Sequence, residues 1–255
     1  MSEPIGTLLN LKSMVYDEWL TGLLGKQSYR FLADQLPVDA LRRELQFLVS
    51  ELRKESLFLY SKVSVEALAQ VKFLEEARFN LVDTCVTFAR QRVNVPNSVG
   101  SFQIGFANPE DADGVARLAK RSFRYSRFHR DASIPTAVAN TIKEEWARNY
   151  FLGKRGNQMV VAKARDEIIG FLQLVIEKEK SLITIDLISV DERWRGQGVA
   201  TGMIYYAERT HADCARIQAG TQLANVPSVR LYEKMGFQLA SAEYIFHRHF
   251  SPEAP

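Results

Sequence analysis

The chain has few cysteines and no long hydrophobic run. Its two cysteines among 255 residues, Cys85 and Cys214, lie far apart in apolar surroundings and lack the spacing of a metal site. We therefore expect buried thiols in a reducing compartment. No apolar run approaches the roughly 18 residues of a membrane-spanning helix, and the first residues lack a basic segment followed by an apolar block. These absences predict a cytoplasmic protein that does not insert into a membrane.

The chain also lacks a large excess of positive or negative residues. The chain has 33 Lys and Arg residues against 30 Asp and Glu residues, a formal net charge of +3. A field this weak does not favour binding of nucleic acid, so any attraction for anions has to come from local clusters. With 46% hydrophobic residues, the chain is long enough for one large domain or two small ones.

The residue pattern predicts an α/β protein in two parts. Residues 91–101 concentrate Pro, Asn, Ser and Gly, the composition of a linker, so we place a boundary near Ser98 between domains 1–98 and 99–255. Before the boundary, apolar spacing predicts helices over 8–24, 37–52 and 65–76, and strands over 28–32, 57–63 and 79–89. After it, the pattern predicts strands over 102–106, 159–164, 167–176, 182–190, 215–221 and 237–250, with helices over 108–121 and 136–151, after Gly198, and from Asn225 to Gly236.

The stretch Asp186–Met203 is an apolar strand that turns through a basic, glycine-rich loop into a helix. Because Gly196 and Gly198 have no Cβ, backbone N–H groups at the helix N-terminus can approach an anion closely. Thr201 stands where the third glycine of a dinucleotide loop belongs, and the loop lacks the lysine of a nucleoside triphosphate site. The sequence therefore predicts a phosphate site of another kind.

A short internal repeat links the two parts of the chain. Residues 73–81 align with residues 231–239 without a gap, and the register extends upstream. In this register Leu74 matches Tyr232 and Ala67 matches Asn225, so the first copy keeps the apolar frame and lacks the polar groups. We infer a duplicated half-domain whose first copy is structural; the alternative is a chance likeness between two amphipathic helix-to-strand junctions.

Two motifs carry a family resemblance. The loop fits the pattern Arg/Gln-x-x-Gly-x-Gly/Ala as Arg195-Gly-Gln-Gly-Val-Ala200, and Asn225 precedes a helix containing Leu-Tyr-Glu-Lys-Met-Gly-Phe at 231–237. Together they resemble the acetyl-CoA signature of the GNAT superfamily of N-acetyltransferases, over residues 102–250. The resemblance implies an α/β (α+β) fold with a central mixed sheet flanked by helices, preceded here by a smaller, degenerate half-GNAT α/β domain. It also implies acetyl-CoA as co-substrate and no metal.

The resemblance also implies how acetyl-CoA is held. Loop N–H groups bind the pyrophosphate, the strand before the loop pairs with the pantetheine amides, and Leu187 or Ile188 directs an N–H at the thioester oxygen. Arg195 is either a direct pyrophosphate contact or a solvated side chain, and Asn225 caps its helix, binds the cofactor arm, or does both. The expected cofactor-binding residues are Leu187, Ile188, Ser189, Val190, Arg195, Gly196, Gln197, Gly198, Val199, Ala200, Thr201, Asn225 and Arg230.

Catalysis requires a proton donor for the CoA thiolate and a base for the attacking amine. Tyr232 matches the family's general acid, and a phenol with a pKa of about 10 is protonated at neutral pH. Asp186 is the best-placed carboxylate for the base, with a purely structural role as a strand-end hydrogen-bond acceptor as the alternative. A water chain or His129 are further candidates for the base.

A narrower resemblance concerns the acceptor. Ser126–Asp131, the pair Glu145-Trp146 and residues 81–88 are similar to strings in the dTDP-fucosamine N-acetyltransferases of bacterial surface-polysaccharide synthesis. That likeness implies a nucleotide-linked 4-amino-4,6-dideoxy sugar as acceptor and a possible homodimer. A nucleotide sugar requires cations for its diphosphate and an aromatic plane for its base. The expected acceptor-binding residues are Arg124, Tyr125, Arg127, Phe128, His129 and Arg130.

Other functions remain open at this point. The same machinery acetylates amino acids, aminoglycosides or protein termini, which do not require the basic and aromatic segment, and a silent binding module would keep the fold alone. Retention of Tyr232 and of the intact loop argues against the silent module. His247 and His249 lie on one face of the last strand, but without a third ligand they predict no metal site.

Overall fold

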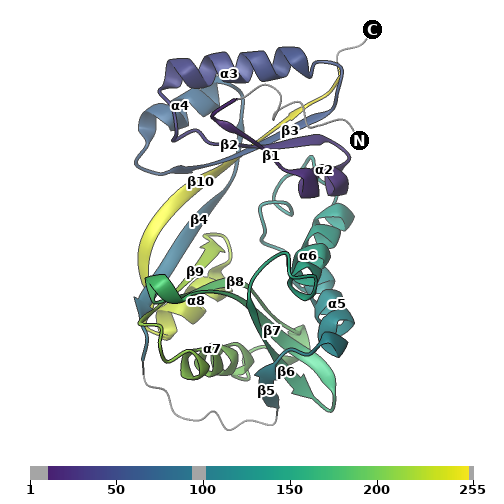
Figure 1. Ribbon diagram of the computed structural model, residues 1–255, viewed down its shortest axis with the longest axis vertical. Helices are drawn as coiled ribbons and strands as arrows, with labels where there is room; N and C mark the ends of the chain where they lie inside the picture. The colour runs from purple at the N-terminus through teal and green to yellow at the C-terminus, as the bar shows by residue number, and fades with distance from the viewer. Residues whose placement is uncertain (1–10, 94–101, 253–255) are drawn as a thin grey trace. The chain divides into compact units, whose positions relative to one another are not determined.

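The computed structural model describes residues 11–93 and 102–252, which form two compact units (Figure 1). Unit 1 contains the described residues up to Cys85, Arg130–Val138, and the chain from Ala242 onward; unit 2 contains the described parts of Val86–His129 together with Ala139–Ser241. Both units contain helices and strands, which confirms the predicted mixed α/β class. The boundary predicted near Ser98 lies outside the described residues.

Unit 1 is a small sheet with helices packed against it. The strand β1 is antiparallel to β2, β2 is parallel to β3, and β3 is antiparallel to the end of β10. The elements are β1 (Met14–Tyr16), α2 (Glu18–Leu24), β2 (Gln27–Phe31), α3 (Val38–Glu51), β3 (Leu57–Ser64), α4 (Leu68–Glu76), the start of β4 (Asn80–Gln91) and the end of β10 (Gln238–Phe250).

The helix expected over residues 8–24 is confirmed for Glu18–Leu24, but the described residues before it are not helical. Met14–Tyr16 forms β1 instead, because these residues pair with Tyr29–Phe31 of β2. The helix begins only after Asp17, whose side chain accepts a hydrogen bond from the Leu20 N–H at 2.9 Å and so caps the first turn. Tertiary strand pairing thus overrides the helical apolar spacing.

Unit 2 contains another run of neighbouring strands, in which β8 lies between β7 and β9. Its strands follow the order β9-β8-β7-β6-β5; β8 and β9 are parallel, and the other pairs are antiparallel. The strands are β5 (Gln103–Phe106), β6 (Gln158–Ala164), β7 (Glu167–Glu177), β8 (Leu182–Val190) and β9 (Arg216–Gln222), and the helices are α5 (Ala112–Ser122), α6 (Thr136–Phe151), α7 (Val199–Thr210) and α8 (Val226–Lys234).

Helices cover both faces of the unit 2 sheet. Phe171 of β7 packs in a buried cluster with Val115 and Leu118 of α5 and with Ala147 of α6. At the preceding residue, a Cβ added to Gly170 would lie 3.0 Å from Met203 and 3.0 Å from Val199, both on α7. Consecutive strand residues face opposite sides, so α5 and α6 cover one face and α7 the other.

The two junctions that align in the sequence have similar backbone conformations, while the duplication of a half-domain stays a prediction. Helices α4 and α8 occupy matched positions, as do the strands β4 and β10 that follow them. The residues before the two helices have almost the same conformation, with φ −84° and ψ 64° at Ala67 and φ −83° and ψ 64° at Asn225. Both helices end at a left-handed residue, Arg78 (φ 56°) or Gly236 (φ 79°). Arginine in this conformation costs about 1–2 kcal/mol that glycine avoids.

The two copies exchange their last strands. The end of β10, in the second copy, pairs with β3 of the first over Glu243–Phe250. The end of β4, in the first copy, belongs to unit 2, where β4 neighbours β9 and the Arg92 N–H donates to the Ala215 carbonyl at 2.8 Å. The compact units therefore divide at Cys85 and Ser241, within strands, and the strands expected over 237–250 are one strand.

Within the described residues, no helix is long and apolar enough to cross a membrane.

Candidate active site

Strand β8 separates from its neighbour β9 halfway along its length. The two strands are in register from Leu182 opposite Arg216 to Ile185 opposite Ala219, and in the described residues the pairing ends there. On its other edge, β8 pairs with β7 through Ile185 and again through Leu187, which leaves Asp186 as the extra residue of a β-bulge. The bulge bends β8 and leaves the edge of Leu187–Val190 without a partner in β9. A free edge of this kind can pair with the amides of a ligand.

The loop after β8 forms a helix N-terminus that is open to an anion. Gly196 and Gly198 have φ values of 76° and 81°, in the left-handed region, and Gly198 is the residue that precedes α7. A Cβ at either position would meet nothing within 4 Å, so the space beside the loop is open. The first N–H groups of a helix have no acceptor within the helix, and its dipole adds about half a positive charge there.

The arginines of the loop are held by acidic residues. Arg193 donates to Asp191 at 3.0 Å and to Glu167 at 2.6 Å, and Arg121 donates to Asp191 at 2.6 Å. Hydrogen bonds from Arg193 lower the pKa of Asp191 to about 2. Arg195 donates from Nε to the Val190 carbonyl at 3.2 Å. Backbone N–H groups, more than free arginine charge, therefore make this loop attractive to an anion. Sequence reasoning missed Asp191, although an acid directly after an apolar strand was a visible signal.

Tyr232 lies in the core of unit 2, on α8. Its side chain is 1% exposed, and its ring centroid is 5.9 Å from that of Phe88 and 5.4 Å from that of Phe237. Burial raises the pKa of Tyr232 well above its ordinary value, so the phenol carries its proton at neutral pH. Asn225 begins α8, where its Oδ1 accepts from the Ser228 N–H at 3.4 Å. This satisfies the capping role, while the roles of Asn225 and the exposed Arg230 toward a cofactor stay predictions.

Asp186 at the bulge is an acceptor of four hydrogen bonds. Trp146 Nε1 donates at 3.0 Å and Gln173 Nε2 at 2.9 Å. Arg155 donates twice, from Nε at 2.8 Å and from Nη2 at 2.7 Å. These donors hold the carboxylate in place and use most of its capacity to accept hydrogen bonds. Of the two roles considered for Asp186, the geometry favours the structural acceptor over the base.

The segment expected to bind an acceptor is not uniformly exposed. Arg124 is largely exposed and lies 3.6 Å from Glu192, and Tyr125 is 39% exposed. Phe128 is buried at 1% exposure, with the Arg127 guanidinium 4.4 Å from its ring centroid. A buried ring offers no face to a nucleotide base, so Tyr125 is the aromatic residue available for stacking.

His129 and Arg130 are both engaged by neighbouring residues. Ser126 Oγ lies 2.6 Å from His129 Nδ1, and Asn140 Oδ1 lies 2.9 Å from Nε2. Since Asn140 Oδ1 can only accept, Nε2 carries the proton and Nδ1 accepts from Ser126. Burial lowers the pKa of His129, and its one lone pair is occupied, which disfavours it as the base. In unit 1, Arg130 donates to the Val82 carbonyl at 3.3 Å and lies 3.5 Å from Asp83.

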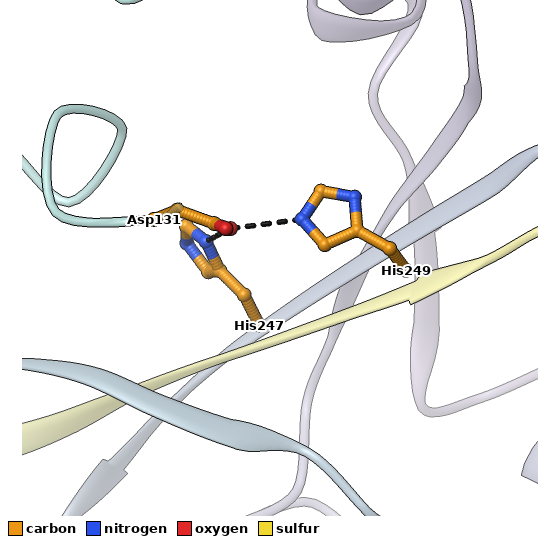
Figure 2. Close-up of side chains that lie close together, drawn as sticks. All are labelled: Asp131, His247 and His249. Carbon is orange, nitrogen blue, oxygen red and sulfur yellow. Dashed lines mark hydrogen bonds and ion pairs between the residues drawn. The ribbon is translucent and has the colours of Figure 1, made fainter. Parts of the chain in front are cut away.

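The third partner that His247 and His249 lacked in the sequence is Asp131. Figure 2 shows both imidazoles of β10 directed at the Asp131 carboxylate, at 2.6 Å from His247 Nδ1 and 2.8 Å from His249 Nε2. Lys26 Nζ lies 3.2 Å from the other nitrogen of His249, so His249 donates to Asp131 from Nε2. Burial opposes ionisation, but the two histidine hydrogen bonds outweigh it and hold the pKa of Asp131 far below its ordinary range. The sequence showed no third ligand beside the two histidines, but these three side chains offer ligand atoms within 4.8 Å of one another, a set that could hold a metal ion. A metal-free protein therefore stays a prediction.

Sequence reasoning also missed Lys143. This lysine lies on the buried face of α6 with Ala139, Ile142 and Ala147, and its side chain reaches the rings of Phe123 and Trp146. The signal was a lysine spaced one residue from Ile142 and four from Ala147, on the apolar stripe of the helix.

Comparison with known proteins gives a family and two groups of relatives. Residues 117–237 match the model described as "Acetyltransferase (GNAT) family". The spore coat polysaccharide biosynthesis protein SpsD of Bacillus subtilis is 34% identical over 148 residues, which cover 57% of this chain and 50% of SpsD. Human N-alpha-acetyltransferase 30 is 22% identical over 128 residues, covering 46% of this chain and 35% of that protein. The chain thus spans half or less of the length of these relatives.

Solved structures share the fold across most of the chain. A GCN5-related N-acetyltransferase from Sphaerobacter thermophilus has a TM-score of 0.61 at 10% identity, covering 89% of this chain and 74% of that one. A tandem GNAT protein from the clavulanic acid biosynthesis pathway also has a TM-score of 0.61, at 11% identity, covering 90% of this chain and 77% of that one. At such identities the likeness concerns the fold, and it confirms the GNAT fold expected from the sequence.

Proposed function

We propose that the chain is an N-acetyltransferase that uses acetyl-CoA, and the match of residues 117–237 to the acetyltransferase (GNAT) family model supports this proposal. The observation that carries the proposal is the bulged strand β8, whose edge at Leu187–Val190 separates from β9 directly before the Gly196–Gly198 loop. The free edge suits the pantetheine amides, and the loop suits the pyrophosphate. An N–H of Leu187 or Ile188 suits the thioester oxygen as negative charge develops on it.

Tyr232 completes the proposed chemistry. As the amine attacks the thioester, the C–S bond breaks and the thiolate takes a proton from the phenol. Burial keeps Tyr232 protonated at neutral pH, which fits the role of general acid. Asp186 is then a positioning residue. Its hydrogen bonds to Trp146, Gln173 and Arg155 fix the bulge of β8, and the bulge sets the direction of the strand N–H groups.

For the acceptor we propose the 4-amino group of a dTDP-linked 4-amino-4,6-dideoxy sugar, acetylated in the cytoplasm. SpsD, named for spore coat polysaccharide biosynthesis, supports a sugar acceptor by its 34% identity. The exposed Arg124 and Tyr125 supply a cation and an aromatic plane for a nucleotide diphosphate. The likeness to N-alpha-acetyltransferase 30 supports a second candidate, the N-terminal amine of a peptide.

A panel of amines offered to the purified chain tests both candidates. We expect free thiol to be released from acetyl-CoA fastest with dTDP-4-amino-4,6-dideoxygalactose, and slowly with peptides, amino acids and aminoglycosides. Turnover of a peptide N-terminus without turnover of any nucleotide sugar would replace the first acceptor with the second. Absence of thiol release with every amine would contradict the enzyme assignment.

Replacing Gly198 with valine is expected to weaken acetyl-CoA binding at least about tenfold. The new side chain fills the open space beside the loop and strains a backbone with φ 81°, so N–H hydrogen bonds to the pyrophosphate, worth about 1.5–3 kcal/mol each, are lost. The measurement is the KM for acetyl-CoA. Gly25→Val is the matched control, because Gly25 has φ 62°, meets nothing within 4 Å and lies in unit 1. An equal rise in KM for both variants would contradict the assignment of the loop.

A further inference from the structure

Lys143 is a buried amine without an acidic partner. Its residue is 7% exposed, and its Nζ lies 4.3 Å from the ring centroid of Trp146 and 5.0 Å from that of Phe123. In the described part of the chain, no carboxylate or carbonyl oxygen accepts a hydrogen bond from this Nζ. The neighbouring Lys120 and Glu144 form an ion pair at 2.8 Å, which is the usual arrangement for a structural lysine. Lys143, in contrast, contacts two aromatic rings and forms no ion pair within the described residues.

Lys143 lies near the bulge of β8 in the proposed site. Trp146, whose ring contacts Nζ, donates to Asp186 at the bulge of β8, and both Trp146 and Phe123 pack against the cluster that contains Leu187. The charge of Arg127, in the acceptor segment, also acts on Lys143. The amine thus lies one side chain away from the bulge of the strand proposed to hold the thioester.

The surroundings of Lys143 disfavour the ammonium form. Burial is the largest cause, and the charges of Arg127 and Arg155 act in the same direction. Asp186 acts in the opposite direction, but Arg155 already pairs with that carboxylate at 2.7 Å. The balance lowers the pKa of Lys143 from 10.5 to about 7, and burial also lowers the pKa of His129. Near neutral pH, a substantial fraction of Lys143 is an unprotonated amine with a free lone pair.

We propose that Lys143 Nζ is the general base that takes the proton from the acceptor nitrogen during acetyl transfer. The inference rests on the proposed function and assigns the one catalytic role that the sequence left open. As the nitrogen forms its bond to the acetyl carbon, its proton moves to Nζ, the C–S bond breaks with its electron pair on sulfur, and Tyr232 gives its proton to the thiolate. Solvent then takes the proton from Lys143 and returns one to Tyr232, which balances the reaction. The faces of Trp146 and Phe123 stabilise the ammonium while it exists.

Two substitutions show whether Lys143 acts by accepting a proton or only by its positive charge. Lys143→Met keeps the length and packing of the stem, and Lys143→Arg keeps the positive charge but cannot lose its proton at working pH. We expect both variants to lose about 10²-fold in kcat/KM at pH 7.5 and to lose the ascending limb near pH 7 of the wild-type profile. Lys120→Met, on the exposed ion pair of α5, is the control and should keep both the rate and the profile. Near-normal turnover by Lys143→Arg, or an unchanged limb in Lys143→Met, would overturn the proposal.

Melting temperature provides a readout that does not depend on activity. Because the folded-state pKa of Lys143 is lowered, the folded state binds fewer protons than the unfolded state between about pH 7 and pH 10.4, so stability rises with pH in that window. Lys143→Met removes this dependence and should melt above the wild type at pH 6, with the difference shrinking toward pH 10. If Lys143 stays charged in the wild type, the difference in melting temperature will not shrink as the pH rises, and the proposal is overturned. A Lys143→Met variant that melts below the wild type at every pH would also overturn it.

Failure of this proposal is distinguishable from failure of the proposed function. The wild-type rate with the nucleotide sugar tests the function, whereas the ratio of variant to wild type, measured on whichever amine the wild type acetylates, tests Lys143. A wild type that acetylates only peptides, with both Lys143 variants slowed about 10²-fold, would keep the base and replace the acceptor. A wild type that is active on the nucleotide sugar, with both Lys143 variants equally active, would keep the acceptor and remove Lys143 as the base.

Discussion

The Tyr232→Phe variant is expected to lower kcat about 10²- to 10³-fold with little change in the KM for acetyl-CoA. The substitution removes one hydroxyl from a fully buried ring and leaves its packing against Phe88 and Phe237 intact. General-acid assistance in proton transfer typically contributes about 10²- to 10⁴-fold, so the loss should fall on the chemical step. Steady-state thiol release at saturating acetyl-CoA measures it. Tyr206→Phe on α7, whose ring packs against Phe106, is the matched control and should keep the wild-type rate.

The dependence of kcat on pH is a second test of the role of Tyr232. Tyr232 acts in its protonated form, and burial raises its pKa above the ordinary value of about 10. The wild type should therefore show no descending limb from this residue below about pH 10. A fall in kcat at lower pH that disappears in Tyr232→Phe would contradict a buried, protonated phenol. Equal rates in wild type and variant would remove Tyr232 from the acid role.

The Arg90→Met variant is expected to lose about 3–5 kcal/mol of unfolding free energy. Arg90, on β4, donates from both Nη atoms to Glu208 of α7 at 2.8 Å each, and the two side chains are only 6% and 0% exposed. Its guanidinium also lies 4.6 Å from the ring centroid of Phe237. Removing the arginine leaves a carboxylate buried without a partner, which costs far more than the pair itself contributes. Denaturant unfolding, with the slope compared between variants, measures the loss.

A double variant shows whether the unpaired charge is the cause. Arg90→Met combined with Glu208→Leu removes both charges from the same site and should recover most of the lost stability. If the double variant loses as much unfolding free energy as the two single variants lose in sum, the loss comes from packing and not from the unpaired charge. Because Phe88 on β4 contacts Tyr232, loosening β4 in Arg90→Met should also reduce kcat at temperatures well below its melting point.

Local signals in the sequence predicted the cofactor side of the site. Gly196, Gly198 and Gly236 mark places where the backbone takes positive φ, and such positions can be recognised from short motifs. The same is true of Asn225, whose cap sets the start of α8. The repeat was predictable because the apolar frame around Leu74 and Tyr232 survived, even though the polar residues differ between the copies.

Partnerships between distant elements were not predictable. The roles of Asp186 and Lys143 depend on which side chains surround them, and Trp146, Arg155 and Gln173 come from different parts of the chain. The exchange of β4 and β10 could not be predicted either, because an alternating pattern predicts a strand but not the strand that pairs with it. Phe128 shows the reverse error, in which an aromatic residue beside arginines suggested a binding face but lies in the core.

Product analysis tests the central claim most directly. Purified protein is incubated with acetyl-CoA and dTDP-4-amino-4,6-dideoxygalactose, and mass spectrometry of the nucleotide sugar is compared with the amount of free thiol. We predict one N-acetylated nucleotide sugar for each thiol released, with the acetyl group on the 4-amino nitrogen. Thiol release without any acetylated sugar, or no thiol release beyond that of acetyl-CoA alone, would contradict the account.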